Sequence, residues 1–250
     1  MTTRVTNLKL SDHEILMLIK AIIAEKPTYG YRRVCSVLNH RLGAENTVNH
    51  KRIYRIMKQH SLLHLPYGKR STLVHDGKII TIRSNLRWCS DSFTIICDNG
   101  ERVQVAFALD CCDREVIGYT ATAIGGIDSE MICDLIANCV AYRFGASCKL
   151  PNPIQWLTDN GPCYIARRTV NFARALGFEV CTTRPYSPES NGMAEALVKT
   201  MKRDYVWLGD LSCSAAVFRQ LPLWFDDYNE NAPHKGLKML SPRQFLRKVV

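Results

Sequence analysis

The stretch WCSDSFTIICDNGERVQVAFAL, residues 88–109, decides the fold class of this 250-residue chain. β-Branched and aromatic residues flank an Asn-Gly pair at 99–100, and this pattern predicts two antiparallel strands joined by a tight turn. Residues 115–123 (EVIGYTATA) predict a third strand. The pattern then alternates between helix and strand, over residues 129–144, 153–159, 166–177 and 178–183. This order predicts a mixed α/β sheet flanked by helices, with short helices from residues 206–250 packed on it.

The N-terminal third predicts a separate helical module. SDHE, residues 11–14, is a capping-box pattern in front of an apolar helical run, and residues 31–42 and 49–63 predict two more helices. Three short helices, the last rich in Lys and Arg, are typical of a helix-turn-helix-like DNA-binding module, here residues 1–66. A plain helical bundle with a solvated basic face fits the same pattern. Residues 67–84 lack a clear period and predict a linker.

The positive charge is concentrated in the same third of the chain. Residues 1–90 hold 16 Lys and Arg against 5 Asp and Glu, whereas residues 91–250 hold 17 against 18. The first segment therefore carries +11 and the second −1, which together give the net +10. Such asymmetry indicates an anionic polymer or a membrane as partner. Because the basic segment has no strongly hydrophobic amphipathic face, nucleic acid is favoured.

Composition excludes several other classes of protein. Hydrophobic residues make up 46% of the chain, which predicts a folded core. No apolar run approaches the roughly 20 residues that cross a bilayer, and the N-terminus lacks a signal-peptide pattern, so we expect a soluble intracellular protein. The 11 cysteines are scattered without a C-x-x-C pair, which predicts reduced core residues. His60 and His64 have metal-ligand spacing, but no cysteine pair completes a zinc site.

Three carboxylates stand where an α/β protein places its site. Asp91 lies on the first predicted strand, Asp159 ends the strand at 153–159, and Glu195 opens a helix after a polar loop. Carboxylates in apolar strands are rarely buried unless they are paired or bound to metal. Three of them without a histidine cluster predict Mg²⁺ or Mn²⁺, as two ions about 4 Å apart that support phosphoryl transfer. Asp110 is the main competitor, although each strand-end aspartate also suits a plain turn.

The stretch SPESNGMAEALVKTMKRD, residues 187–204, sets one glutamate beside two lysines. On a helical wheel Asn191, Glu195, Lys199 and Lys202 share one arc. Apolar residues on the other arc predict packing against a core; they are Met193, Ala194, Leu197, Val198, Met201 and Tyr205. The polar arc fits a solvated face with an intrahelical pair of Glu195 and Lys199. It also fits a metal-binding acid beside lysines that hold DNA phosphates.

The spacing of these residues carries a specific family resemblance. Thirty-five residues separate Asp159 from Glu195, and Lys202 follows the glutamate by seven. With WCSD around Asp91 and LTDNG around Asp159, this resembles the D-D-35-E core of retroviral-type integrases and, more closely, the OrfB-type transposases of bacterial insertion sequences. PTYGYRRV and NHKRIYRIMK resemble the helix-turn-helix segment of that family, and YNENAPHKGLKMLSPRQFL resembles its C-terminal signature. Ala232 departs from the basic residue that many relatives carry, and the zinc-binding domain of retroviral integrases is absent.

The resemblance implies an RNase-H-like fold over residues 85–250, a five-stranded mixed sheet that brings Asp91, Asp159 and Glu195 together as metal-binding catalytic residues. The implied chemistry is metal-dependent cutting at the 3′ ends of an insertion element. Each freed 3′-OH then attacks a target phosphodiester, with no covalent enzyme intermediate. An RNase-H-like nuclease that cuts without joining, and an inactive DNA-binding remnant or regulator of the element, are the alternatives. The residues expected to contact DNA are Lys199, Lys202, Asn191, Arg32, Arg33, Lys51, Arg52 and Arg55.

The resemblance also implies partners for the chain. These are the element ends and target DNA, and further copies of the chain in a homo-oligomer on DNA, in the cytoplasm of a bacterium. In the family, a small upstream reading frame, OrfA, carries another helix-turn-helix and is often fused by translational frameshifting. Because Met1 leads almost directly into the first predicted helix, we expect weak end specificity from these 250 residues alone, and the OrfA product, or a fusion with it, is a possible partner.

Overall fold

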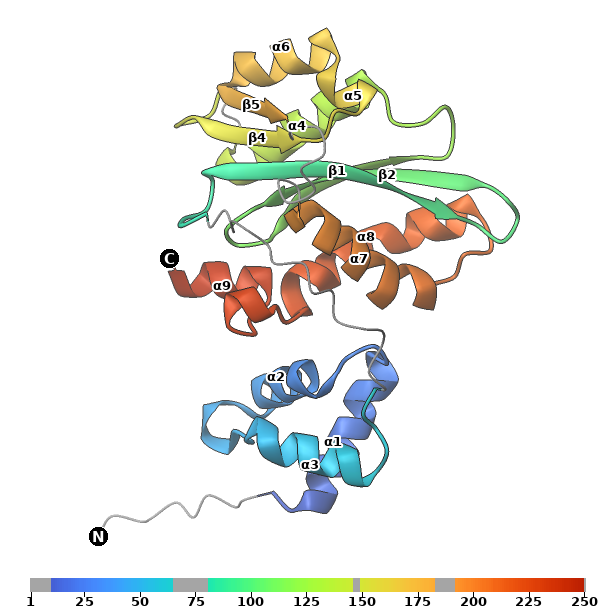
Figure 1. Ribbon diagram of the computed structural model, residues 1–250, viewed down its shortest axis with the longest axis vertical. Coiled ribbons are helices and arrows are strands. Elements are labelled where there is room, and N and C mark those ends of the chain that lie inside the picture. The colour runs from blue at the N-terminus through green and yellow to red at the C-terminus, as the bar shows by residue number, and fades with distance from the viewer. Residues whose placement is uncertain (1–9, 65–80, 146–148, 183–191, 250) are drawn as a thin grey trace, which may run out of the picture.

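The computed structural model describes residues 10–64, 81–145, 149–182 and 192–249 (Figure 1). They form an N-terminal helical unit and a five-stranded sheet with helices on both faces. The helices and strands in chain order are α1 (Asp12–Glu25), α2 (Tyr31–Leu42), η1 (Ala44–Asn46), α3 (His50–Gln59), β1 (Arg87–Ile96), β2 (Arg102–Asp110), β3 (Val116–Thr122), α4 (Ser129–Phe144), β4 (Ile154–Thr158), α5 (Pro162–Ile165), α6 (Arg167–Leu176), β5 (Phe178–Thr182), α7 (Gly192–Asp204), η3 (Val206–Leu208), α8 (Ser214–Asn231), η4 (Lys235–Leu237) and α9 (Pro242–Val249). Of the predicted linker at 67–84, residues 67–80 lie outside the described residues.

The sheet has the strand order β3-β2-β1-β4-β5. β1 and β2 pair antiparallel around the Asn-Gly turn, where Gly100 has φ +85°, a left-handed conformation that glycine adopts without steric cost. β2 and β3 also pair antiparallel, whereas β1 with β4 and β4 with β5 pair in parallel. The mixed α/β sheet and its hairpin, predicted from the sequence, are therefore confirmed.

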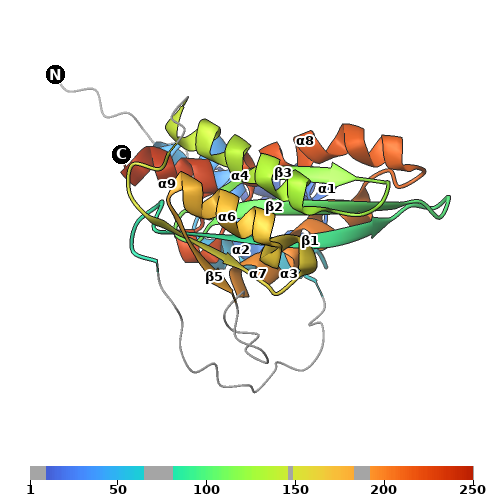
Figure 2. The same cartoon turned by 90° about the horizontal axis from the view of Figure 1, so that it is seen from above.

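Alternation of side chains along β1 separates the two faces of the sheet. Cys89, Phe93 and Ile95 point to one face and join the buried core under α7 and α8. Trp88 points to the other face, where it packs with Trp156 in the core under α4 and α6. Figure 1 shows α4, α5 and α6 above the sheet and α7, α8 and α9 below it, and Figure 2 looks down on the upper layer.

Helix α7 lies against β1 through the apolar arc that the sequence indicates. Ala194, Leu197 and Met201 are almost fully buried in the same core as Phe93. The packing predicted for this arc is confirmed. Glu195 is left on the partly exposed side of the helix.

The C-terminal tail differs from the expected short helices, because α8 runs for 18 residues through Pro222. A proline removes one N–H from the helical ladder and normally ends or kinks a helix. Here Val217, Leu221, Phe225 and Tyr228 are buried at helical spacing against the sheet. This packing outweighs the local preference of the proline, which is the usual outcome when tertiary burial opposes propensity.

Helices α1, α2 and α3 enclose a core of their own, which includes Ile15, Ile19, Leu38, Ile53 and Met57. The predicted capping box is present at the start of α1. The Ser11 N–H donates to Glu14 Oε2 at 2.7 Å, and the Glu14 N–H donates to Ser11 Oγ at 3.3 Å.

Helix α3 ends at Gln59, earlier than the predicted residue 63. Ser61 has φ +55°, its N–H donates to the Lys58 carbonyl, and the Leu62 N–H donates to the Met57 carbonyl. These two bonds form a Schellman cap, which satisfies the last carbonyls of the helix and turns the chain away. The apolar residues after Gln59 therefore continue the periodic pattern without continuing the helix.

The ten described cysteines are free, and six of them are buried, as predicted for small core residues. Within the described part of the chain, no helix is long and apolar enough to cross a membrane.

Gly118 on β3 sets how closely the sheet approaches α4. The Cβ of an alanine at this position would lie 2.7 Å from the Sγ of Cys139, which is fully buried. Gly118→Ala is expected to lower the free energy of unfolding by about 1–3 kcal/mol, the usual cost of overpacking. In a Cys139→Ala background the same change should cost much less. Urea unfolding of the four proteins measures this coupling, and equal costs in both backgrounds would show that the contact does not limit the packing.

Candidate active site

Asp91 and Asp159 come from neighbouring parallel strands. In the pairing of β1 with β4, Trp88 lies opposite Trp156 and Cys89 lies opposite Leu157, and the same offset relates Asp91 to Asp159. Asp91 shares its side of β1 with Cys89, which faces α7. Continuing the alternation of β4 by one residue puts Asp159 on that face too. Both aspartates are half-buried.

Backbone N–H groups hold the two carboxylates. The Ser92 N–H donates to Asp91 Oδ1 at 2.7 Å, and the Gly161 N–H donates to Asp159 Oδ1 at 2.9 Å. Beneath them, Ser90 Oγ donates to the Phe107 carbonyl at 2.7 Å and lies 3.1 Å from the Tyr164 hydroxyl of α5. Sequence reasoning missed Ser90 and Tyr164; a polar residue at a buried strand position beside Asp91 was the available signal.

Glu195 approaches the same face of the sheet from α7. Its side chain is 43% exposed, and Oε2 accepts from Lys199 Nζ at 3.3 Å. The intrahelical pair that the sequence suggested is therefore present. Lys199 itself is 76% exposed, so the pair leaves most of this lysine open to solvent.

The electrostatics of Asp91 connect the three acids. Burial raises the pKa of Asp91; the Ser92 N–H opposes this, and the negative charges of Asp159 and Glu195 raise the pKa further. Among the described residues, no three His, Cys, Asp or Glu side chains lie close enough to hold a metal ion as they stand. The three acids thus share one face and repel one another without a closed coordination shell.

Asp110 is built differently. It is fully buried at the end of β2, opposite Trp88, and accepts backbone hydrogen bonds at 2.7 Å from Asn85, at 2.7 Å from Cys112 and at 3.2 Å from Asp113. Burial and the charge of Asp113 raise its pKa to about 6. This carboxylate organises a turn, as the turn interpretation of this segment predicted.

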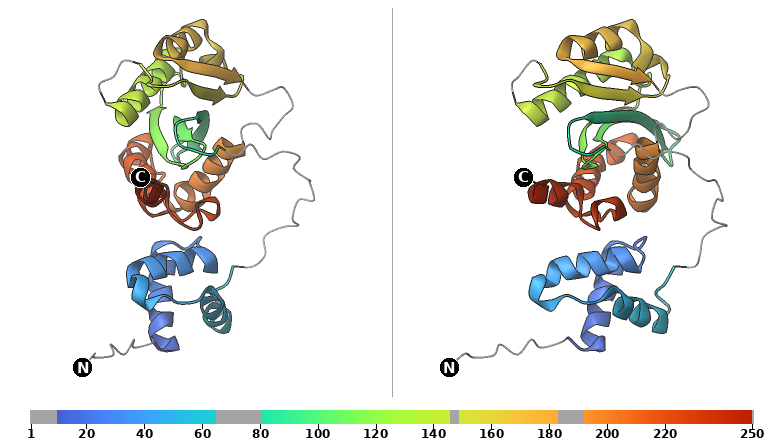
Figure 3. Two further views of the ribbon diagram at one scale, coloured as in Figure 1. Left: turned by 90° about the vertical axis from the view of Figure 1, so that its left-hand side faces the viewer. Right: turned by 60° about the vertical axis from the view of Figure 1, so that its left-hand side comes forward.

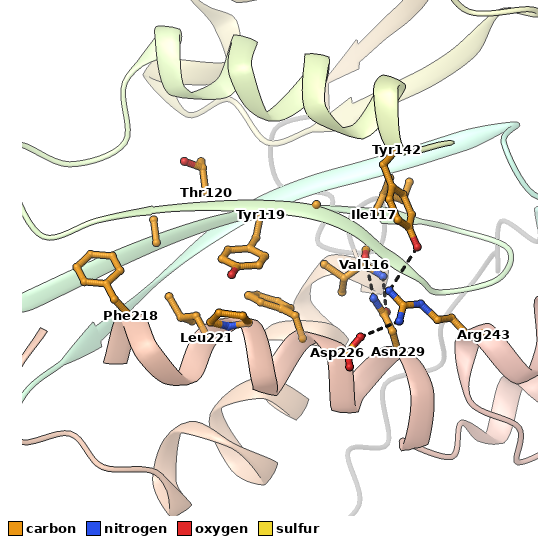
Figure 4. A pocket seen from close by; sticks show the side chains of 14 residues that line it. Val116, Ile117, Tyr119, Thr120, Tyr142, Phe218, Leu221, Asp226, Asn229 and Arg243 are labelled. Atoms are coloured by element: carbon orange, nitrogen blue, oxygen red, sulfur yellow. Dashed lines mark hydrogen bonds and ion pairs between the residues drawn. The ribbon is translucent and has the colours of Figure 1, made fainter. Parts of the chain in front are cut away.

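A pocket of about 550 Å³ lies along the edge strand β3, between α4 and α8 (Figure 4). Its lining includes Tyr119, Tyr142 and Phe225 but none of the three acids. Asn229 closes one wall by donating to the Val116 carbonyl and accepting from the Val116 N–H, both at 2.9 Å. The pocket therefore lies at the β3 edge of the sheet, and β2 and β1 separate it from β4, the strand that leads to Asp159.

The residues expected to contact DNA fall into three groups. Arg32, Lys51 and Lys199 are exposed, and Lys202 is half-buried on the Glu195 side of α7. Three arginines form ion pairs with carboxylates. Arg52 and Arg55 pair with Asp12, and Arg33 pairs with Asp204. Asn191 lies outside the described residues.

Comparison with known proteins places the chain in a family. Profiles described as integrase core domain match residues 82–188 and 176–242, and an HTH-like domain profile matches residues 10–70. The chain is 46% identical over 241 residues to the transposase InsD for insertion element IS2A/D/F/H/I/K of Escherichia coli, which covers 94% of this chain and 79% of that protein. The chain belongs to this family of insertion-element transposases. It is a DNA transposase, a polynucleotidyl transferase with a DNA-binding helix-turn-helix-like region.

A solved structure supports the fold of this transposase. The simian T-cell lymphotropic virus intasome, in complex with PP2A regulatory subunit B56 gamma, matches with a TM-score of 0.54 at 17% identity, over 92% of this chain and 73% of that chain. At this identity the likeness concerns the fold alone. The RNase-H-like architecture expected from the family resemblance is confirmed.

The contrast between Asp91 and Asp110 gives a stability test of the transposase without metal or DNA. Asp110→Ala leaves one buried and two partly buried N–H groups unpaired, so the free energy of unfolding should fall by about 1–3 kcal/mol. Asp91→Ala removes one hydrogen bond at an exposed N–H and relieves the repulsion from Asp159 and Glu195, so stability should be unchanged or slightly raised. Urea unfolding in a chelator measures both. A large loss in Asp91→Ala would assign that carboxylate to the fold.

Proposed function

We propose that this transposase cuts the 3′ ends of its insertion element and joins them to target DNA by metal-dependent transesterification at Asp91, Asp159 and Glu195. The observation that carries the proposal is the convergence of three acids on one face of the sheet: the register of β1 with β4 relates Asp91 to Asp159, and α7, which packs on that face, carries Glu195. A fold gathers like charges on one face at a cost, and a function that needs them there explains the arrangement.

The donor set fits divalent metal ions. Asp91, Asp159 and Glu195 offer carboxylate oxygens, which Mg²⁺ and Mn²⁺ prefer. A cation held by them would reverse the repulsion that raises the pKa of Asp91. We propose two ions, as Mg²⁺ or Mn²⁺, which when bound supply Lewis acidity and an activated water or 3′-hydroxyl. The Ser92 and Gly161 N–H groups orient the two aspartates before any ion arrives.

DNA is proposed to be held at two places. Near the acids, Lys199 and Lys202, with Asn191, contact the phosphates that flank the cut. Farther away, the helix-turn-helix-like region supplies most of the salt-dependent affinity through exposed cations such as Arg32 and Lys51. Arg52 and Arg55 share this surface, where their pairing with Asp12 fixes their direction.

Assembly and domain limits belong to the same proposal. Joining two element ends requires two sites, so we propose a homo-oligomer on DNA, acting with the OrfA product or as a fusion with it. The proposed units are residues 1–66, a linker at 67–84 and a catalytic unit at 85–250. The separate apolar core of α1, α2 and α3 supports the first unit.

Neutralising each acid tests the site. Asp91→Asn, Asp159→Asn and Glu195→Gln should each abolish end cleavage and joining, with rates reduced at least 10³-fold, while DNA affinity and fold are kept. Labelled element ends incubated with Mg²⁺ report both steps, and the joining step separates a transposase from a nuclease. Asp134→Asn, an exposed aspartate on α4 across the sheet, is the matched control. Near-normal cutting by any one of the three variants would remove that residue from the site.

Removing charge from α7 tests the lysines. If they hold phosphates, Lys199→Ala with Lys202→Ala should lower cleavage and joining much more than total DNA affinity. If they are only a solvated face, stability should change by a few tenths of a kcal/mol and cutting should be normal. Lys248→Ala, an exposed lysine on α9, is the control. Rates and binding are measured on the same labelled duplex, and normal cleavage by the double variant would return the pair to the surface role.

A further inference from the structure

The N-terminal helical unit touches the rest of the transposase through polar groups. Lys26 Nζ lies 2.5 Å from Asp227 Oδ2 on α8, and Ser36 Oγ donates to the Met239 carbonyl at 2.7 Å. Arg33 joins Asp204, the last residue of α7, at 2.6 Å. We refer to Lys26, Thr28, Arg33 and Ser36 as the docking face.

Asp204 is the centre of these contacts. Its side chain is 3% exposed, although aspartate is rarely buried without partners. Thr28 Oγ1 donates to Oδ1 at 2.5 Å, Arg33 Nη1 donates to Oδ2 at 2.6 Å, and Arg203 binds both oxygens. Burial acts to raise the pKa of Asp204, but the hydrogen bonds from Arg203 and Arg33 hold it below its usual value. The carboxylate is therefore ionised and bound from both units.

Arg33 is equally committed. Its side chain is 19% exposed, its guanidinium lies 4.1 Å from the centre of the Tyr29 ring, and Nη2 donates to the Thr28 carbonyl at 2.9 Å. The guanidinium lies on an aromatic ring and binds a carboxylate and a carbonyl, so few of its N–H groups are available to bind a phosphate. In contrast, Lys51, Tyr54 and Lys58 on α3 are exposed. Figures 1 and 3 show α2 nearer to the sheet domain than α3.

Helix α7 connects the docking face to the proposed site. Glu195 and Asp204 stand nine residues apart on one helix, so they are about 14 Å apart along its axis. Leu197 and Met201 between them are buried in the core under the sheet, which keeps this helix from turning freely. A displacement of the Asp204 end of α7 therefore also shifts the Glu195 end.

We propose that Asp204 is a positioning residue: it locks the helix-turn-helix-like unit onto the helix that carries Glu195, so that DNA bound on α3 and the cut site share one rigid frame. This inference rests on the proposed function for the role of Glu195, but the docking itself does not. It assigns Arg33 to the joint between the units in place of a DNA contact.

Hydrogen exchange of the full chain, without DNA or metal, tests the docking. Asp204→Asn and Arg33→Ala should each raise exchange at least tenfold on both sides of the joint, in peptides covering 26–30 and 200–206. Amides in the core of α1, α2 and α3 should keep their protection, which shows that the unit is still folded. Arg41→Ala is the control, because Arg41 pairs with Glu25 inside the same unit. Unchanged exchange across the joint in both variants would overturn the proposal.

Hydrogen exchange also tests whether DNA bound on the N-terminal unit changes the protection of α7. A duplex oligonucleotide of the element end, added without metal, should slow exchange in α7 of the wild type and have no such effect in Asp204→Asn. Arg33→Ala should lose the effect as well, whereas Arg33→Lys should keep part of it, because lysine returns one cation to the carboxylate. Equal protection of α7 in wild type and Asp204→Asn would overturn the positioning role. This readout holds even if the wild type fails to cut, an outcome that would count against the proposed function alone.

Cleavage gives the third readout. In Asp204→Asn and in Arg33→Ala the rate of end cleavage should fall at least tenfold with DNA affinity within twofold of wild type, whereas Arg33→Lys should keep part of the rate. A loss of affinity equal to the loss of rate would instead assign Arg33 and Asp204 to DNA binding and overturn the inference.

Discussion

The parallel pairing of β1 with β4 is the constraint on which the site depends. Strands joined by a hairpin, such as β1 and β2, bring together residues that are close in sequence. The carboxylate of Asp110 on β2 accepts hydrogen bonds from the turn that follows it. A parallel neighbour must instead return by a crossover, here β2, β3 and α4. The crossover lets the register of two strands that run the same way relate Asp91, in the middle of β1, to Asp159, just after the end of β4, on the face that α7 covers.

Asp91 and Asp110 show how the same side chain serves two ends in one sheet. Asp110 is fully buried and its pKa is raised to about 6, but three backbone N–H groups bind its carboxylate, and the fold gains a defined turn. Asp91 is half-buried with one such bond and two acidic neighbours, so the protein binds its carboxylate at fewer points than that of Asp110. Stability alone would not select that arrangement. The carboxylate with one backbone hydrogen bond is the one to expect at a site that meets a cation, and the carboxylate bound by three backbone N–H groups belongs to the scaffold.

Local sequence predicted the elements well because each is set by nearby residues. The Asn-Gly turn, the capping box at Ser11 and the apolar arc of α7 depend on neighbours within a few positions, and the structure has all three. The prediction of short helices was wrong for α8, because burial against the sheet overrides the effect of Pro222. That burial cannot be seen in the sequence of the helix itself. The end of α3 was wrong because a cap at Ser61 uses no distinctive residue. The three acids were proposed from their places on a strand, at a strand end and on a helix, together with their spacing, and their role stays a prediction. Their neighbours Ser90 and Tyr164 meet only in the folded chain.

Non-local pairing also changes the meaning of the +11 charge at the N-terminus. The net charge alone suggests a uniformly basic surface, but several of the cations form ion pairs within the protein. Arg52 and Arg55 turn toward Asp12, and Arg33 and Lys26 turn toward carboxylates of the sheet domain. Each unit has its own apolar core, so the joint between them is left to a few charged groups whose geometry is directional. A joint of that kind fixes orientation more than it adds stability, and orientation is what an enzyme requires when one part holds the DNA and another part cuts it.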